Sequence, residues 1–198
     1  MTVTTPRREA TRQRLVEAAI REFAARGIDA TSVEQLCEAA GFSRGAFYSN
    51  FATRDDLCLA ILEQHRDAIL EGLTRTFKEP DGPVDFQWAL HEGMPQFFSL
   101  IGPTDDFRIT MLEIRLRATR SPELRERMLE FEVATRPVME AFLDDIAARV
   151  GITFRTSTAQ LLNLAEAVYF HGTLEGSDPS ELMASTITAL CGVRAPVG

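Results

Sequence analysis

The sequence predicts an all-α protein, in which an N-terminal three-helix helix-turn-helix domain is joined by a long helix to a C-terminal helical domain. Apolar residues recur at the three- and four-residue spacing of amphipathic helices along most of the chain. Residues that favour helix ends, such as Gly27, Ser43 and Gly151, stand at the borders of these stretches. The apolar–polar alternation of a β-strand is not found. We expect the first domain to cover residues 1–53 and the second residues 54–198.

The composition is typical of a cytoplasmic globular protein. Hydrophobic residues make up 45% of the 198 positions and charged residues 25%. No apolar run is long enough to span a bilayer and no signal peptide opens the chain, so we expect no membrane partner. The three cysteines are far apart in the sequence, which fits a reducing cytoplasm and argues against a disulfide framework.

The net charge of -8 is unevenly distributed. Residues 1–60 hold eight arginines and eight acidic residues, so the whole negative charge falls on residues 61–198. A neutral end on an acidic body allows a polyanion such as DNA to approach from that end only. Arg7 and Arg8 are either an arm near phosphates or part of a frayed terminus, and both interpretations stay open.

The first helix is expected over residues 9–26, with Gly27 at its end. A second, shorter helix follows, capped by Thr31 or Ser32, with Glu34 or Gln35 in the position that closes a capping box. Gly41 suits the left-handed residue that ends this helix.

The third helix is short and begins after Ser43, whose hydroxyl suits a helix cap. Ala46, Phe47 and Phe51 form its inward side. One cation, one phenol and several small groups remain outside, which suits the major groove of DNA. These outward residues are Arg44, Gly45, Tyr48, Ser49 and Asn50.

This part of the chain resembles the tetracycline-repressor (TetR) family of bacterial transcription regulators. The resemblance covers roughly the first third of the chain, and order, spacing and residue types all agree. The matching residues are Leu15–Ala19, Phe23, Gly27, Thr31–Val33, Ala39–Gly41, Ser43–Tyr48, Phe51 and Leu57. Phe42, Cys37 and Arg54 depart mildly from the family pattern, and Phe42 is expected to shift the turn slightly.

The resemblance implies that particular residues contact double-stranded DNA. Arg44 suits a guanine, with a phosphate contact or a solvated charge as the alternative. Gly45 allows close approach of the backbone, unless the helix is simply too short for glycine to matter. Tyr48 suits a phosphate, with packing as the alternative, and residues at helix N-termini either bind phosphate or only cap. The full set is Thr31, Ser32, Ser43, Arg44, Gly45, Tyr48, Ser49, Asn50 and Arg54.

The remaining chain is expected to be helical throughout. Thr53 caps a long helix that reaches about Lys78, and a linker follows at Pro80–Pro83. Gly93 and Pro95 are expected to bend the next helix. The further helices are expected over residues 105–120, 122–150 with Pro137 as a kink or a split, 156–174, and from Asp178–Pro179 to about Cys191.

Aromatic and methionine residues are frequent in the first helices of the C-terminal part. The family resemblance implies a pocket there for a small apolar or amphipathic inducer, lined by Trp88, His91, Phe98, Phe107, Met111, Phe131 and Phe142. For any one aromatic residue, ordinary core packing is the alternative. Glu113 and Arg117 are further candidates for polar groups of the pocket, with solvated surface charges as the alternative.

The last two helices carry small residues among apolar ones. The resemblance implies that they form a four-helix interface in a homodimer, which fits a palindromic operator. The residues expected there are Leu161, Leu164, Val168, Gly172, Leu182 and Thr186, with packing inside one chain as the alternative.

The sequence gives no sign of catalysis. His91-Glu92 is followed by Gly-Met-Pro and not by a zinc-binding HExxH pattern, and a phosphate loop and a nucleophile elbow are also missing. We expect no enzyme, no metal and no cofactor, and we predict a ligand-responsive repressor. The alternative is a DNA-binding protein of the same fold controlled by a protein partner or by oxidation of Cys58 or Cys191.

Overall fold

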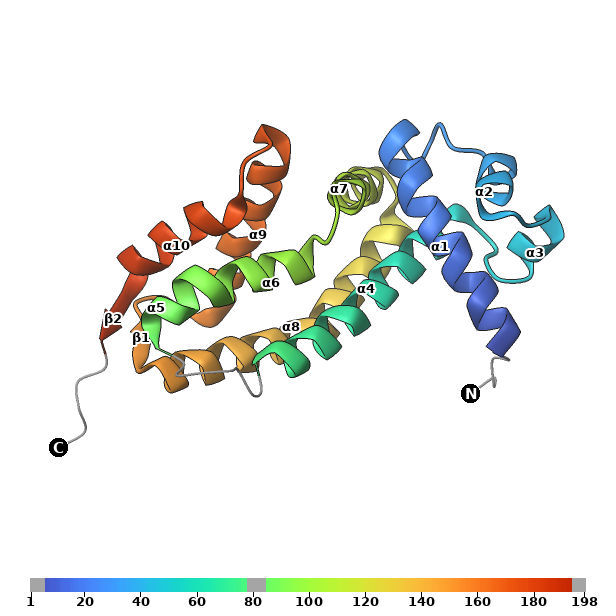
Figure 1. The fold of residues 1–198 in the computed structure, drawn as a ribbon. Coiled ribbons are helices and arrows are strands. Elements are labelled where there is room, and N and C mark those ends of the chain that lie inside the picture. The colour runs from blue at the N-terminus through green and yellow to red at the C-terminus, as the bar shows by residue number, and fades with distance from the viewer. Residues whose placement is uncertain (1–5, 78–84, 194–198) are drawn as a thin grey trace. The chain divides into compact units, whose positions relative to one another are not determined.

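The computed structural model describes residues 6–77 and 85–193, and it confirms the all-α prediction (Figure 1). The chain divides into two compact units. Unit 1 comprises Met1–Arg66 and Thr104–Leu129, and unit 2 comprises Asp67–Pro103 and Glu130–Gly198. The expected domain boundary at residue 53 stays a prediction.

Unit 1 contains three N-terminal helices, one complete later helix and parts of two others. These are α1 (Pro6–Arg26), α2 (Val33–Ala40), α3 (Arg44–Tyr48), the start of α4 (Arg54–Phe77), α7 (Asp105–Arg120) and the start of α8 (Pro122–Val150). α1 packs against both α2 and α7. The fully buried side chains of this core include Leu15, Phe23, Ile28, Leu36, Phe47, Phe51 and Leu57.

Local capping explains why the short helices of unit 1 begin and end where they do. The Ser32 hydroxyl accepts a hydrogen bond from the backbone N–H of Gln35, and the Gln35 side-chain oxygen accepts one from the backbone N–H of Ser32, so the capping box uses these two residues. Gly41 ends α2 with φ of 71°, which is the left-handed conformation that glycine tolerates best. Ser43 caps α3 through the backbone N–H of Ala46 at 3.2 Å.

Unit 2 is built from α5 (Phe86–Trp88), η1 (Ala89–Gly93), α6 (Met94–Ile101), the remainder of α4 and α8, α9 (Thr158–Glu175) and α10 (Pro179–Leu190). η1 is a π-helical turn, in which the N–H of Met94 reaches back five residues to the carbonyl of Ala89. It ends two residues before Pro95, which has no N–H, so the expected bend takes the form of a widened turn. Pro137 lies inside α8 and does not split it.

The expectation that the C-terminal part holds helices only is wrong at two places. β1 (Ile152–Phe154) pairs antiparallel with β2 (Cys191–Val193), and Thr153 lies opposite Gly192. Strands of three residues are too short to show an alternating pattern in the sequence, and each gains its hydrogen bonds from a distant segment.

Two further expectations concern single segments. The linker at Pro80–Pro83 falls outside the described residues. Within residues 6–77 and 85–193, the search for a helix with the length and hydropathy of a membrane span found none.

Candidate functional site

The outer face of α3 combines exposed polar groups with a buried apolar side. Phe47 and Phe51 are almost fully buried, and their rings lie 5.8 Å apart. The expected residues Ser32, Ser43, Arg44, Gly45, Tyr48 and Ser49 are all exposed, while Asn50 is half-buried. Six of these seven residues are therefore accessible at α3 and at the start of α2, and Asn50 is partly accessible.

Arg44 and Tyr48 are the two large side chains of this face. Arg44 forms an ion pair with Glu34 of α2 at 2.7 Å, and both side chains are more than half exposed. The Tyr48 ring stands edge-on against Phe47 at 5.4 Å, and 51% of the residue is exposed. Both side chains are thus within reach of a partner molecule, although Arg44 has to leave Glu34 to meet it.

Arg8 adds a positive charge beside the end of α3. Its guanidinium donates to the carbonyl of Ser49 at 2.8 Å and to the Asn50 side chain at 3.4 Å. The sequence left open whether Arg8 belongs to an arm or to a frayed end, because this contact joins residues 41 positions apart. The structure places it in α1, which begins at Pro6 and so is longer than expected.

Two of the expected DNA-contacting residues serve the interior of unit 1. Thr31 is fully buried, and its hydroxyl donates to the carbonyl of Gly27 at 2.7 Å. The guanidinium of Arg54 donates to the carbonyls of Ile28, Asp29 and Thr31, at 2.7, 3.2 and 2.9 Å. In this structure neither side chain is available to a phosphate, because both are engaged by the loop before α2.

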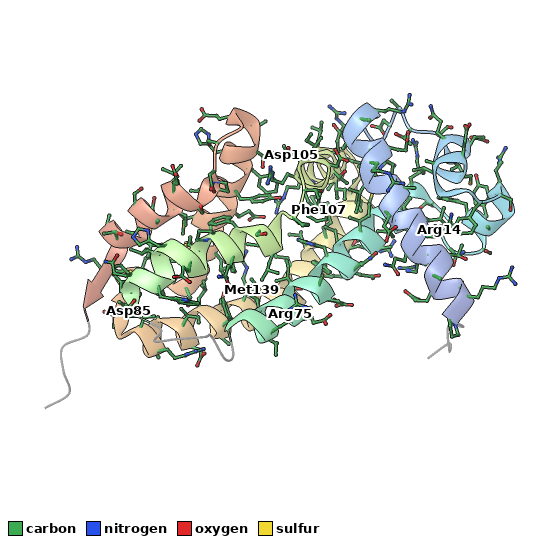
Figure 2. The ribbon with its side chains drawn as sticks, in the orientation of Figure 1. Arg14, Arg75, Asp85, Asp105, Phe107 and Met139 are labelled. Carbon is green, nitrogen blue, oxygen red and sulfur yellow. The ribbon has the colours of Figure 1, made fainter. Side chains whose placement is uncertain are left out.

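Phe42, which departs from the family pattern, has an evident partner. The guanidinium of Arg14, labelled on α1 in Figure 2, lies over the Phe42 ring at 4.7 Å and also donates to the carbonyl of Ala40 at 2.8 Å. These two contacts of Arg14 stabilise the turn between α2 and α3. Sequence reasoning missed this role of Arg14, since nothing local connects it to the turn.

A second candidate site is an apolar pocket in unit 2. Its described lining comes from α5 to α6, α8, β1, α9 and α10, and it contains no charged side chain. The cavity has about 80 Å³ of open space. Representative lining residues are Trp88, Phe97, Phe98, Phe142, Ile146 and Leu161. Such a pocket suits an apolar group and excludes a charge, because no partner for the charge is present in the lining.

The pocket brings together three of the seven residues expected to bind a ligand, namely Trp88, Phe98 and Phe142. His91 lies on η1 with an exposed side chain, and Phe131, on α8, is outside the described lining. Phe107 and Met111 belong to α7 in unit 1, where the ring of Phe107 packs on His65 at 4.1 Å. These two apolar residues therefore belong to unit 1 and not to the pocket of unit 2.

The residues expected at a dimer interface divide into two groups. Leu161, Val168 and Gly172 are buried inside unit 2, so these residues are not free to meet a second copy. Leu182 is 46% exposed, and Leu164 and Thr186 are half-buried. The spacing of apolar residues along a helix identifies the side that is buried in the same chain. The outward side of α9 and α10 also includes Leu174, which is 75% exposed.

Cysteine chemistry has little support at the described positions. Burial raises the pKa of the Cys58 thiol to about 12, with a further contribution from Asp55. Burial also raises the pKa of Cys191, which is half-buried. Within the described residues, no group of three or more His, Cys, Asp or Glu side chains is arranged to hold a metal ion.

Comparisons of sequence point to one family. Residues 15–61 match the model of the bacterial regulatory proteins of the tetR family. Over 60 residues the chain is 40% identical to the uncharacterized HTH-type transcriptional regulator YwcC of Bacillus subtilis (strain 168). That match covers 30% of this chain and only 27% of the relative.

Solved structures resemble the fold over nearly the whole chain. Salmonella enterica GusR aligns with a TM-score of 0.68 at 23% identity, covering 96% of each chain. FadR from Bacillus subtilis in complex with stearoyl-CoA aligns with a TM-score of 0.68 at 16% identity, covering 89% of this chain and 95% of FadR. At these identities the likeness concerns the fold alone.

Proposed function

The chain belongs to the tetR family of bacterial regulatory proteins, and from this premise we propose that it is a DNA-binding transcription regulator of the cytoplasm. In the proposed mechanism, two copies hold a palindromic operator and repress transcription. A small apolar or amphipathic molecule bound in unit 2 then favours a state that releases the operator.

The exposed face of α3 carries the proposal for DNA binding. A five-residue helix with Phe47 buried beneath it presents one cation, one phenol and small polar groups, which suit the major groove. We assign base reading to Arg44 and phosphate contacts to Tyr48, Ser43 and the backbone near Gly45. Ser32, Ser49, Asn50 and the neighbouring Arg8 complete the proposed surface, from which Thr31 and Arg54 are left out.

A homodimer is proposed through the outward faces of α9 and α10. Leu174 and Leu182 are large exposed apolar residues there, and Leu164 and Thr186 are half-buried. A two-fold pair presents two copies of α3, which fits half-sites one helical turn or a multiple apart.

Ligand control is proposed through α4. This helix runs without a break from unit 1 into unit 2, so a change at its C-terminal half is passed to its first turn. The apolar lining of the pocket supports an apolar or amphipathic inducer, and the FadR complex shows that a protein of this fold binds stearoyl-CoA. Coupling of about 1–3 kcal/mol is typical of allostery, so strong release needs a larger difference in ligand affinity between the states.

The proposal is tested by measuring binding of the protein to the DNA upstream of its own gene at several salt concentrations. Sequence-selective binding that weakens steeply with salt is expected, because phosphate contacts release counterions. Binding that is equally weak on operator and scrambled DNA, with a sample shown by mass spectrometry to carry no bound molecule, would count against the proposal.

A further inference from the structure

Phe142 of α8 lies between two hollows of unit 2. On one side it lines the apolar pocket, and on the other it lines a groove of about 550 Å³ between α4 and α8. Its ring is stacked nearly parallel to Phe97, with centroids 6.2 Å apart and planes inclined by 6°. Phe97 lines the pocket only, so Phe142 is the aromatic residue common to both hollows.

The two hollows differ in size and chemistry. The pocket holds about 80 Å³ of open space, well below the ~300 Å³ and more of typical small-molecule sites, whereas the groove falls within that range. The lining of the groove also includes polar residues, namely Thr74 of α4 and the pair Asp145 and Arg149 of α8. Asp145 and Arg149 lie 3.6 Å apart, so their charges offset each other.

We infer that pocket and groove form one two-part site for an uncharged amphipathic molecule, with Phe142 as a movable partition between the parts. The apolar chain of the ligand enters the pocket when Phe142 turns away from Phe97, and its hydroxyl or amide head stays in the groove. A charged head is disfavoured, because it gains one member of the Asp145–Arg149 pair and is repelled by the other. This inference rests on the proposed function and names its ligand class.

The sequence supplies a direct readout, because Trp88 is the only tryptophan of the chain and lines the pocket. The probes are decan-1-ol, decanoate and decylammonium, titrated into the full-length protein while tryptophan fluorescence is recorded. Decan-1-ol is expected to change the fluorescence and to bind about tenfold more tightly than either charged probe. Tighter binding of a charged probe, or binding without a fluorescence change, would overturn the inference.

Phe142→Ala and Phe98→Ala form a matched pair, because both remove a benzyl side chain that lines the pocket, but only Phe142 also lines the groove. The association rate of decan-1-ol is expected to rise about tenfold in Phe142→Ala and to change little in Phe98→Ala. Equal association rates in the two variants would overturn the role of Phe142. If thermal unfolding shows that Phe142→Ala is not folded, Phe142→Leu takes its place. Operator binding by the ligand-free protein is measured in parallel: its loss would contradict the proposed function, whereas failure of the decanol experiments alone contradicts only the two-part site.

Discussion

Arg117 of α7 donates a hydrogen bond to the carboxylate of Asp55 in the first turn of α4. The same guanidinium also pairs with Asp29 in the loop between α1 and α2. One turn earlier on α7, the carboxylate of Glu113 accepts a hydrogen bond from the backbone N–H of Ile28 at 3.2 Å. α7 therefore holds the loop before α2 and the start of α4 together inside unit 1.

Replacement of Arg117 by Met is expected to lower the free energy of unfolding by about 1–2 kcal/mol, because two charge-assisted contacts at a partly buried site are lost. Urea unfolding followed by circular dichroism measures this change. Arg120→Met is the control, since it removes the same charge from an exposed position of the same helix. Equal destabilisation by both variants would mean that the contacts of Arg117 add nothing.

Glu113 and Arg117 illustrate what the sequence could and could not predict. The helix that carries them was expected over residues 105–120, and this is confirmed, because its cap and its apolar spacing are local signals. Their partners are 62 to 88 positions away in the sequence, so they were considered as polar groups of a pocket. Spacing on a helix shows which side is polar, but not which neighbour that side meets.

A pH dependence is expected from Asp56. The hydrogen bond from Arg127 at 2.9 Å, together with those from Thr53, holds the pKa of Asp56 below its ordinary value. A lowered pKa stabilises the folded state above the unfolded value of about 3.9, and this contribution is lost as the pH falls through the folded pKa. The thermal midpoints of the protein and of Asp56→Asn are therefore expected to differ at pH 6 and to converge towards pH 3.

The control for this series is Asp106→Asn, which removes an exposed carboxylate from the first turn of α7. This control measures how much stability is lost when a favourable charge is removed from a helix N-terminus, without the loss of an ion pair to Arg127. A constant difference between the protein and Asp56→Asn from pH 6 to pH 3 would show that ionisation of Asp56 does not contribute.

Thiol reactivity should separate ligand control from oxidation. With a pKa of about 12, only about one Cys58 side chain in ten thousand is a thiolate at pH 8, and the residue is fully buried. Cys58 is expected to resist iodoacetamide in the native protein and to react in urea, as measured by mass spectrometry. Operator binding is expected to survive peroxide, whereas loss that is prevented by Cys58→Ser or Cys191→Ser would favour oxidation.

The apolar pocket was predicted only in part, for the same physical reason as the contacts of Glu113 and Arg117. Trp88 and Phe142 line one cavity, since aromatic residues on neighbouring helices tend to share a core, and their binding of a ligand stays a prediction. Phe107 was expected there as well, but the structure places it in unit 1. An apolar side chain on an amphipathic helix predicts burial, and the core in which it is buried depends on how the helices pack.

Glu34 is expected to restrain DNA binding, because it holds Arg44 at 2.7 Å and adds a negative charge close to the proposed phosphate contacts. Glu34→Gln removes both effects, so affinity should rise about threefold to tenfold on operator and unrelated DNA alike at low salt. Glu38→Gln is the matched control, since it neutralises another exposed glutamate of α2 that is not paired with Arg44. An equal gain from Glu34→Gln and Glu38→Gln would show that the Glu34–Arg44 pair has no specific role.

Arg44→Ala, by contrast, should weaken operator binding by about 1–3 kcal/mol and remove the preference for the base pair that Arg44 contacts. Fluorescence anisotropy with operators substituted at single positions measures these effects. An equal loss of affinity on all sequences would assign Arg44 to a phosphate contact.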